Sequence, residues 1–246
     1  MINKENAKPV ALVTGAGRRL GRQIAISLAK NGFDIVINYN DSKAGAQQTE
    51  ALIKDLGKMA ISLKADVTDY SQVNIMFQKA IKHFKKIDLL VNNSSIFSYS
   101  PLSKTTEKKW KEVLDLNLSG VFYCSKFASQ YMMKAKSGRI INIASLGGIQ
   151  AWHNHLPYSV SKAGVIMLTK CLAKALSPHI MVNAIAPGTI IIPGEESSKL
   201  EHVPIKTIPL KRYGVPSDIA NLVFFLAQTS NYITGQIFAV DGGRSI

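Results

Sequence analysis

Short apolar runs alternate with longer amphipathic segments along almost the whole chain. The apolar runs predict strands buried on both faces, because a strand with one wet face would alternate apolar and polar residues. Strands are predicted at 10–14, 34–38, 59–64, 89–92, 139–143, 180–186 and 236–240. Helices are predicted at 22–30, 44–56, 69–84, 107–133, 156–176 and 217–228.

Two features mark helix boundaries. Asp69-x-x-Gln72 resembles a capping box and opens the helix that runs to residue 84. The helix at 107–133 is predicted to be interrupted near Asn117 and Gly120. The helix at 156–176 has no Pro or Gly cluster after Gly164, so it is predicted to be long and regular.

The alternation of strands and helices predicts a doubly wound α/β fold. It predicts a parallel seven-stranded sheet with helices on both faces, in one domain that covers residues 1–246 of this 246-residue chain. The segment 190–208 contains Pro and Glu and lacks clear periodicity or a strand-pairing signal. We expect it to be an inserted loop that covers the substrate.

Composition is that of an ordinary globular protein, with 46% hydrophobic and 19% charged residues. No apolar run approaches the roughly 18 residues that a membrane-spanning helix needs, and the N-terminal segment has no apolar signal core. Cys124 and Cys171 lie in apolar helical contexts and are expected to be free, mostly buried thiols. These features predict a cytoplasmic protein with no metal site.

The formal net charge of +14 is the unusual number. It raises the possibility of a nucleic-acid partner or an anionic surface. However, the 30 Lys and Arg residues are spread along the whole chain, and aromatic residues are not interleaved with them as a stacking platform requires. A solvated basic surface is the simpler interpretation, and nucleic acid is not the expected partner.

Polar residues and glycines follow the predicted strands. In a parallel sheet the carboxyl ends of the strands share one edge, where ligands of doubly wound folds bind. The residues expected at this edge are Gly15, Tyr39, Asp66, Asn93, Ser145, Pro187 and Gly188.

The turn from Gly15 to Gly21 lies between the first strand and a helix. A glycine-rich turn at a helix N-terminus exposes backbone N–H groups that stabilise phosphate charge, so it predicts a dinucleotide site. The spacing is not the familiar G-x-G-x-x-G, because position 20 is Leu. A plain tight turn is the alternative.

The end of the second strand bears on cofactor choice. NAD enzymes place a carboxylate there for the ribose 2′-hydroxyl, but this chain has Tyr39. Arg18, Arg19, Ser42 and Lys43 could meet a 2′-phosphate instead. NADPH is therefore favoured over NADH, although the nearby Asp41 opposes a phosphate.

Tyr158 and Lys162 are four residues apart, which places them on one face of a helix. A nearby ammonium favours the phenolate, so Lys162 is expected to lower the pKa of Tyr158 toward neutrality. The pair is then a plausible acid–base device, whereas an ordinary surface pair is the alternative.

Taken together, the motifs resemble those of the short-chain dehydrogenase/reductase family over nearly the whole chain. They are the turn Thr14–Gly21, Asp66-Val67, Asn92-Asn93, Asn117, Ser145, Tyr158-x-x-x-Lys162, Asn183-x-x-x-Pro187-Gly188, Tyr232–Gly235 and Asp241–Gly243.

The resemblance implies catalytic roles. Tyr158 would be the general acid that protonates the substrate as hydride arrives from the nicotinamide. Lys162 would hold the nicotinamide ribose and lower the Tyr158 pKa, and Ser145 would hydrogen-bond the substrate carbonyl. Asn117 would hold a water that links Lys162 to solvent, unless it is only an Asn satisfied by backbone at a helix break. Ser145, likewise, could be a mere turn residue at a strand end.

The resemblance also implies the cofactor site. The expected residues are Gly15, Arg18, Arg19, Leu20, Gly21, Tyr39, Asn40, Ser42, Asp66, Val67, Asn93, Ser94, Ser95, Tyr158, Lys162, Pro187, Gly188 and Thr189.

Within the family, Arg19 stands where most members have Gly and resembles the pteridine reductases. The stretches 92–97, 187–195 and 240–245 resemble the same subgroup. That likeness implies a pterin substrate stacked on Phe97, with Ser95 and Arg19 hydrogen-bonding cofactor or pterin beside Ser145 and Tyr158. The leading hypothesis is therefore an NADPH-dependent pterin reductase that acts as a homotetramer.

One departure favours a different substrate. Many pteridine reductases carry Asp where this chain has Ser145, and Ser suits ordinary ketone reduction. The alternative is a 3-oxoacyl-[acyl-carrier-protein] reductase or another carbonyl reductase of the family. Its substrate, a β-keto thioester on an acidic carrier protein, would suit the basic stretches 104–111 and 126–139. A cofactor-binding regulator without catalysis is a further alternative, against which the intact set of four catalytic residues argues.

Overall fold

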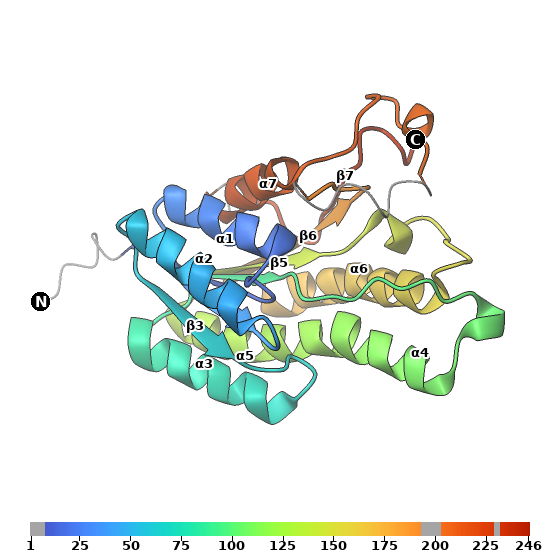
Figure 1. The fold of residues 1–246 in the computed structure, drawn as a ribbon. Coiled ribbons are helices and arrows are strands. Elements are labelled where there is room, and N and C mark those ends of the chain that lie inside the picture. Colours follow the sequence, from blue (N-terminus) through green and yellow to red (C-terminus); the bar gives the residue numbers. More distant parts are fainter. Residues whose placement is uncertain (1–7, 193–202, 229–231) are drawn as a thin grey trace, which may run out of the picture.

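In the computed structural model, which describes residues 8–192, 203–228 and 232–246, seven parallel strands form one sheet in the order β3-β2-β1-β4-β5-β6-β7 (Figure 1). The strands are β1 (Val10–Val13), β2 (Asp34–Tyr39), β3 (Ala60–Lys64), β4 (Leu89–Asn92), β5 (Gly138–Ile143), β6 (Ile180–Pro187) and β7 (Ile237–Val240). The predicted fold class is confirmed.

Helices cover both faces of the sheet (Figure 1). One layer contains α1 (Arg19–Lys30), α2 (Lys43–Asp55) and α7 (Pro216–Gln228), in which α1 contacts both others. The opposite layer contains α3 (Tyr70–Phe84), α4 (Glu107–Leu114), α5 (Gly120–Ala135) and α6 (Leu156–Leu176).

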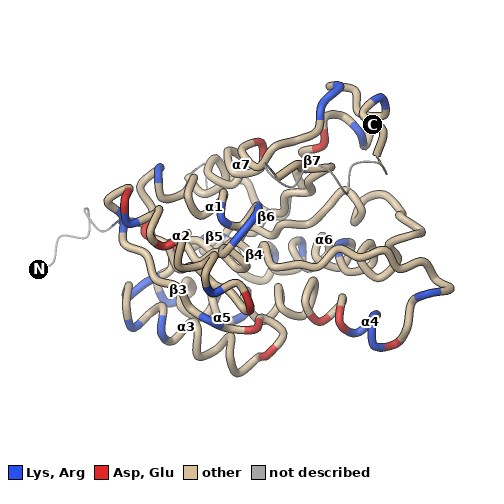
Figure 2. Tube along the Cα trace, viewed as in Figure 1, with Lys and Arg blue, Asp and Glu red and all other residues tan. Residues whose placement is uncertain are grey.

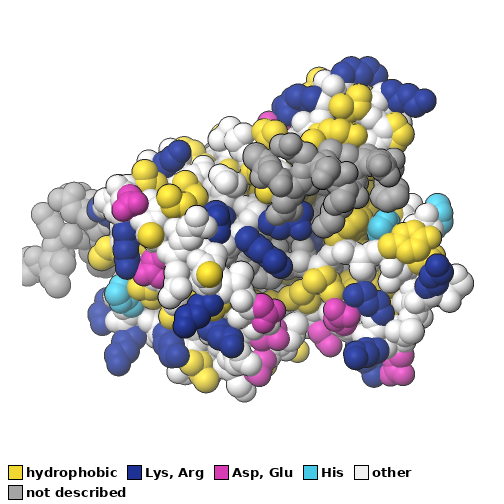
Figure 3. Space-filling view, in the orientation of Figure 1, with side chains coloured by type: hydrophobic (Ala, Val, Ile, Leu, Met, Phe, Trp, Pro, Cys, Tyr) yellow, Lys and Arg dark blue, Asp and Glu magenta, His cyan; other side chains and the backbone are white. Residues whose placement is uncertain are grey.

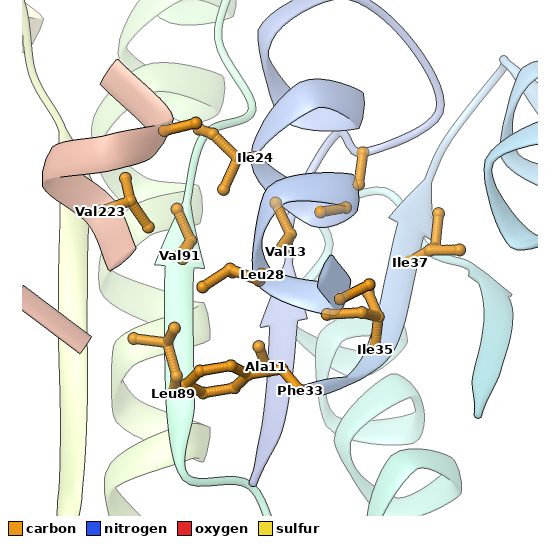
Figure 4. Close-up of a cluster of buried hydrophobic side chains, with 14 of the residues drawn as sticks. Ala11, Val13, Ile24, Leu28, Phe33, Ile35, Ile37, Leu89, Val91 and Val223 are labelled. Atoms are coloured by element: carbon orange, nitrogen blue, oxygen red, sulfur yellow. The ribbon is translucent and has the colours of Figure 1, made fainter. Parts of the chain in front are cut away.

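The strands are buried on both faces, which explains their continuous apolar sequences. In β1, Ala11 and Val13 pack into the core under α1 and α7, whereas Val10 and Leu12 pack into the core under α3 and α5. Figure 4 shows the first of these cores, where Leu28 of α1 and Val223 of α7 lie over the sheet. Successive strand side chains point to opposite faces, so both layers of helices need apolar residues from each strand.

The strand order places a switch point between β1 and β4. From β1 the chain builds outward to β2 and β3, then returns to the other side of β1 and builds β4 to β7. The connections on the two sides lead in opposite directions, which leaves a crevice beyond the carboxyl ends of the strands. This crevice holds the candidate site.

The predicted boundaries agree with the structure to within one or two residues, except at α1. This helix begins at Arg19 rather than residue 22, so Gly21 lies in its first turn. The predicted helix start at Asp69 is confirmed, because its carboxylate accepts hydrogen bonds from the backbone N–H groups of Ser71 and Gln72. The second bond of a capping box does not form, since the Gln72 side-chain oxygen accepts from the Asp66 N–H and not from the Asp69 N–H.

The predicted interruption near Asn117 is a π-helical turn, Asp115–Ser119, between α4 and α5. The expectation for 190–208 needs one correction, because Ile190 forms an isolated parallel bridge with Gly214. Ile205–Thr207 forms a short 3-10 helix. Residues 193–202, the middle of the expected substrate loop, lie outside the described residues.

The prediction for the cysteines is half wrong. Cys124 is buried, and its burial raises the pKa of the thiol to about 12. Cys171 is exposed on α6, because its position in the helix faces away from the sheet. No helix among the described residues is long and apolar enough to cross a membrane.

Candidate active site

A cleft of about 800 Å³ opens beyond the carboxyl ends of the strands. Eighteen residues predicted to bind cofactor or substrate, or to act in catalysis, line it. They are Gly15, Arg18, Arg19, Leu20, Gly21, Tyr39, Asn40, Ser42, Asp66, Val67, Asn93, Ser94, Ser95, Phe97, Ser145, Tyr158, Pro187 and Gly188.

In the glycine turn after β1, neighbouring atoms pack closely against the backbone of the glycines. Gly15 has a φ of +62°, in the left-handed region that favours glycine. A Cβ on Gly21 would lie 2.4 Å from the Gly15 carbonyl oxygen and 2.5 Å from the Asn93 amide nitrogen. The turn and the segment after β4 therefore leave no room for a side chain at position 21.

Hydrogen bonds hold the turn against its neighbours. The Thr14 hydroxyl accepts from the backbone N–H groups of Asn93 and Ser94 at 2.9 and 3.0 Å. The side-chain oxygen of Asn38 accepts from the Gly15 N–H at 3.3 Å, while its nitrogen donates to the Ala65 carbonyl. Asn38 was not predicted, because inside a strand a buried Asn has no sequence signature of its own.

Arg22 is a second residue that sequence reasoning missed. Its guanidinium donates to the carbonyl oxygens of Gly17 and Gly45, and to the Thr49 hydroxyl. A charge-assisted donor with several directed N–H groups thus fixes the glycine turn to α2.

The N-terminus of α1 faces the cleft, and the electrostatic potential there is positive. Its first turn contains no acidic residue, and no described side chain caps it. Arg18, at the cap position, and Arg19 are exposed, and basic side chains gather in the middle of the face shown in Figure 3. Arg19 adopts a φ of +53°, a conformation that glycine adopts more easily.

The end of β2 also suits an anion. Tyr39 is buried, whereas Asn40 and Asp41 are exposed. Ser42 stands at the cap position of α2, where its side chain makes no capping bond within the described part of the chain, and the first turn of α2 has no acidic residue. Asp66, after β3, accepts hydrogen bonds from the Thr68 backbone and hydroxyl.

Ser145, Tyr158 and Lys162 lie together at the end of β5 and the start of α6. Ser145 and Tyr158 line the cleft, and the Ser145 hydroxyl accepts from the Gly147 N–H at 3.1 Å. The Lys162 Nζ is buried, donates to the Ile143 carbonyl at 2.8 Å and lies 5.8 Å from the centroid of the Tyr158 ring.

The predicted effect of Lys162 on Tyr158 is wrong in this structure. Burial raises the pKa of Tyr158, and a hydrogen bond with the Ser145 hydroxyl only partly opposes that rise. Burial also lowers the pKa of Lys162 to about 8. Helical spacing showed that the two side chains share a face, but it could not show that burial outweighs their attraction. Tyr158 is therefore a phenol that keeps its proton at neutral pH.

Asn117 does not line the cleft. It is fully buried in the π-helical turn, where its side chain accepts from the Ile96 N–H and donates to the Ile96 carbonyl and the Ser161 hydroxyl. These bonds join the segment after β4 to the start of α6. The alternative of an Asn satisfied by backbone at a helix break thus describes its side chain, with Ser161 as an additional partner.

Aromatic side chains surround Tyr158. We call Phe97, Trp152 and His155 the aromatic wall. The Phe97 and His155 rings stack with centroids 4.3 Å apart, and Phe97 meets Tyr158 edge-on at 4.8 Å. Trp152 lies nearly parallel to Tyr158, at 12° and 6.3 Å.

Contacts with the backbone hold two side chains of the aromatic wall in place. A Cβ on Gly147 would lie 2.7 Å from the Trp152 ring, so glycine lets the indole pack directly on backbone. The His155 Nδ1 lies 2.7 Å from the Ser98 carbonyl oxygen. Trp152 and His155 were not predicted, since their contacts join segments distant in sequence.

Some predicted residues do not reach the cleft surface, and other residues do. Lys162 and Thr189 join Asn117 in not lining it. Lining residues not predicted include Asn38, Asp41, Ala65, Thr68, Ile96, Glu112, Asp115, Leu116, Ile143, Ala144, Ile190 and Ile192. Nowhere in the described part of the chain do three His, Cys, Asp or Glu residues gather as metal ligands would.

The chain combines a doubly wound parallel sheet, a glycine turn at the switch point and a Ser–Tyr–Lys cluster across the cleft. This combination is typical of one class of oxidoreductases. A family model described as enoyl-(acyl carrier protein) reductase matches residues 15–245. The chain belongs to the short-chain dehydrogenase/reductase family.

Similar proteins cover nearly the whole chain. A 3-oxoacyl-[acyl-carrier-protein] reductase of Synechocystis sp. is 43% identical over 237 residues, 95% of this chain and 96% of that protein. The Staphylococcus aureus protein of the same name is 40% identical over the same shares. The crystal structure of acetoin dehydrogenase from Enterobacter cloacae superposes with a TM-score of 0.89, at 32% identity over 96% of this chain and 95% of the other.

These relatives overturn the leading substrate hypothesis. The prediction of a pterin reductase is wrong, because the relatives at 40–43% identity are named as 3-oxoacyl-[acyl-carrier-protein] reductases. Arg19 and the stretch 92–97 gave a misleading signal, since short loop motifs constrain a cofactor turn without fixing a substrate. Phe97 is 56% exposed and stacks on His155, so its packing within the aromatic wall accounts for it.

Proposed function

We propose that this protein is an NADPH-dependent reductase of 3-oxoacyl groups carried as thioesters on an acyl carrier protein. The observation that carries the proposal is the position of Ser145 and Tyr158 on the wall of the cleft, in a chain 43% identical to a protein of that name. The Ser at position 145, rather than an acid, supports ketone reduction.

The cleft fits a dinucleotide phosphate on physical grounds. The α1 N-terminus offers backbone N–H groups without a competing carboxylate in its first turn, and the glycine turn lets a ligand approach the backbone. Arg18, Arg19 and Ser42 supply donors for a 2′-phosphate, whereas the exposed Asp41 opposes it. The bound cofactor would supply hydride from its nicotinamide ring.

The chain's own residues supply the proton and polarise the carbonyl. Reduction of a ketone to an alcohol consumes a proton at the carbonyl oxygen. Tyr158 is able to donate it, because its raised pKa keeps the phenol protonated at neutral pH. The Ser145 hydroxyl, oriented by the Gly147 N–H, donates a hydrogen bond to the same oxygen and stabilises its developing charge.

Lys162 and Asn117 support this pair from below the cleft surface. With a pKa of about 8, Lys162 is mostly protonated at neutral pH, and its charge favours the phenolate that remains after proton transfer. Asn117 positions the segment after β4 against α6 through Ile96 and Ser161. We infer no water relay from its side chain, whose oxygen and nitrogen both have protein partners.

The carrier protein and the oligomer belong to the same proposal. An acidic carrier would meet exposed Lys104, Lys108 and Lys111 beside the cleft-lining residue Glu112. Figure 2 shows Lys and Arg spread over several elements rather than gathered into one track.

We propose a homotetramer, and light scattering of the purified protein tests it. The segment 190–208 remains proposed as the loop that covers the substrate.

The direct test follows NADPH oxidation at 340 nm with purified protein. We expect turnover with acetoacetyl thioesters of an acyl carrier protein and of coenzyme A, and much less with NADH. The absence of turnover with every 3-oxoacyl thioester would refute the proposal. Turnover with acetoin or a simple diketone alone would point to another carbonyl reductase of the family.

A further inference from the structure

Arg244 is a cation beside the cleft, behind its lining residues, and the mechanism above gives it no role. Its guanidinium carbon lies 5.7 Å from the centroid of the Trp152 ring. Its Nη1 donates to the Thr189 hydroxyl at 3.3 Å, directly after the cleft-lining Pro187-Gly188. Trp152 also stacks with Tyr158, so the guanidinium and the phenol both contact the same indole ring.

The backbone around Arg244 is fixed. The Asp241 carboxylate accepts from the N–H of Gly243 at 2.9 Å and from the N–H of Ser245 at 2.8 Å, so it clamps both neighbours of Arg244. The Gln150 side chain donates to the Arg244 carbonyl at 3.5 Å. The backbone that carries Arg244 is thus fixed, and its guanidinium is placed by the Thr189 hydroxyl and the Trp152 ring, which reduces the conformational freedom that a ligand would have to remove.

The guanidinium lacks a matching negative charge in the described part of the chain. No ion pair joins Arg244 to a described carboxylate, and both oxygens of Asp241 are occupied by backbone N–H groups. The cleft residues that follow Thr189, Ile190 and Ile192, are apolar. The acidic lining residues instead follow β2 or β3 or lie on α4 and the π-helical turn, as Asp41, Asp66, Glu112 and Asp115 do.

A half-buried, pre-positioned guanidinium beside apolar and aromatic side chains attracts an oxyanion more strongly than a solvated one does. We propose that Arg244 binds a negatively charged group of the substrate, a carboxylate or phosphate oxyanion, and so selects charged 3-oxo substrates over neutral ones. This inference rests on the proposed reduction of 3-oxoacyl groups. It names a specificity residue of the same site.

The test compares charged and neutral forms of the same ketone. One pair is acetoacetate and methyl acetoacetate, which tests a carboxylate. The other is acetoacetyl-coenzyme A and the neutral S-acetoacetyl-N-acetylcysteamine, which tests a phosphate. Initial rates of NADPH oxidation give kcat and KM for wild type, Arg244→Gln, Arg244→Lys and Lys79→Gln. Lys79 is exposed on α3 and controls for the loss of one positive charge.

We expect Arg244→Gln to lower kcat/KM about ten- to a hundredfold for the charged member of one pair, mainly through KM, as for the loss of one charge-assisted hydrogen bond. The neutral members and Lys79→Gln should stay within about twofold of wild type. Arg244→Lys should recover part of the loss, because it restores the charge without the planar fork. Which pair responds identifies the oxyanion as carboxylate or phosphate.

Two results would overturn the inference. One is an Arg244→Gln enzyme that reduces both members of both pairs as wild type does. The other is an equal loss on charged and neutral substrates that Arg244→Lys does not recover, which would mean a structural role. If wild type reduces none of the four ketones and also fails with the acetoacetyl thioester of an acyl carrier protein, the proposed function itself fails; turnover of the carrier-bound thioester alone would overturn only the inference about Arg244.

Discussion

The glycine turn after β1 and the aromatic wall around Tyr158 belong to one cleft, but different parts of the chain shape them. Backbone approaches shape the turn, where Gly21 lies against the Gly15 carbonyl and Arg22 ties the turn to α2. Side chains from separate segments shape the wall, where Phe97 stacks on His155 and Trp152 packs on Gly147. The first arrangement suits a cofactor with fixed phosphates, and the second can vary with the substrate.

The largest expected effect separates chemistry from binding. Tyr158→Phe removes the proton donor and should lower kcat about a thousandfold, while the affinity for NADPH, measured by fluorescence titration, stays within about twofold. Tyr99→Phe, at an exposed tyrosine near His155, serves as the control and should keep wild-type turnover. Full activity of Tyr158→Phe would remove Tyr158 from the mechanism.

The turn can be tested by adding one methyl group. Gly21→Ala places a Cβ against the Gly15 carbonyl and should weaken NADPH binding about ten- to a hundredfold, as overpacking of about 1–3 kcal/mol implies. Gly57→Ala is the matched control, because Gly57 has a φ of +72° but a Cβ there would meet no atom within 4 Å. It should lower the melting temperature through backbone strain and leave NADPH binding unchanged.

If Gly21→Ala binds NADPH as wild type does, the turn does not hold the cofactor phosphates. If both variants lose affinity equally, loss of stability explains the effect. Either outcome would remove the contrast between a turn shaped by backbone and a wall shaped by side chains.

Cofactor preference should respond less strongly. Arg18→Gln removes an exposed cation at the start of α1 and should lower kcat/KM for NADPH about tenfold, the loss expected for one charge-assisted hydrogen bond, without changing kcat/KM for NADH. Lys30→Gln, at the other end of α1, controls for net charge. An equal loss with both cofactors would assign Arg18 to the shared phosphates instead of the 2′-phosphate.

The smallest effect concerns pH. Because the pKa of Lys162 is lowered to about 8, its charge is present below that pH and is lost as the pH rises through it. Because the pKa of Tyr158 is raised, the phenol stays protonated over the same range. Above about pH 8, kcat/KM should therefore fall several-fold through loss of the Lys162 charge.

Lys162→Arg keeps its charge at higher pH, so any activity it retains should decline at a higher pH than in wild type. A pH profile of kcat/KM for both proteins checks this. A flat wild-type profile to about pH 9.5 would mean that the charge on Lys162 is not needed.

The sequence predicted the turn better than the wall, for physical reasons. Gly15, Gly21 and the apolar run of β1 are neighbours in the chain, so local spacing carries their geometry. The contacts of Trp152 with Gly147 and Tyr158, and of Arg244 with Thr189, depend on how distant segments meet. The periodicity of hydrophobic and polar residues carries no information about such contacts.

The misjudged pKa of Tyr158 has the same origin. Helical spacing gave the Tyr158–Lys162 pair, but burial of both side chains depends on β5 and the aromatic wall around them. Likewise, the turn that contains Arg19 lines the cleft, yet its motif misled about the class of substrate.

The π-helical turn Asp115–Ser119 determines what a one-residue deletion between α4 and α5 would do. The Gly120 N–H bonds to the Asp115 carbonyl, five residues back, so this turn contains about one residue more than an α-helical turn. Deleting one residue would close this wider turn into a continuous α-helix from α4 to α5, and the backbone that carries Asn117 would change its conformation. Asn117 would then leave Ile96 and Ser161. The more regular helix would be the one that no longer supports the site.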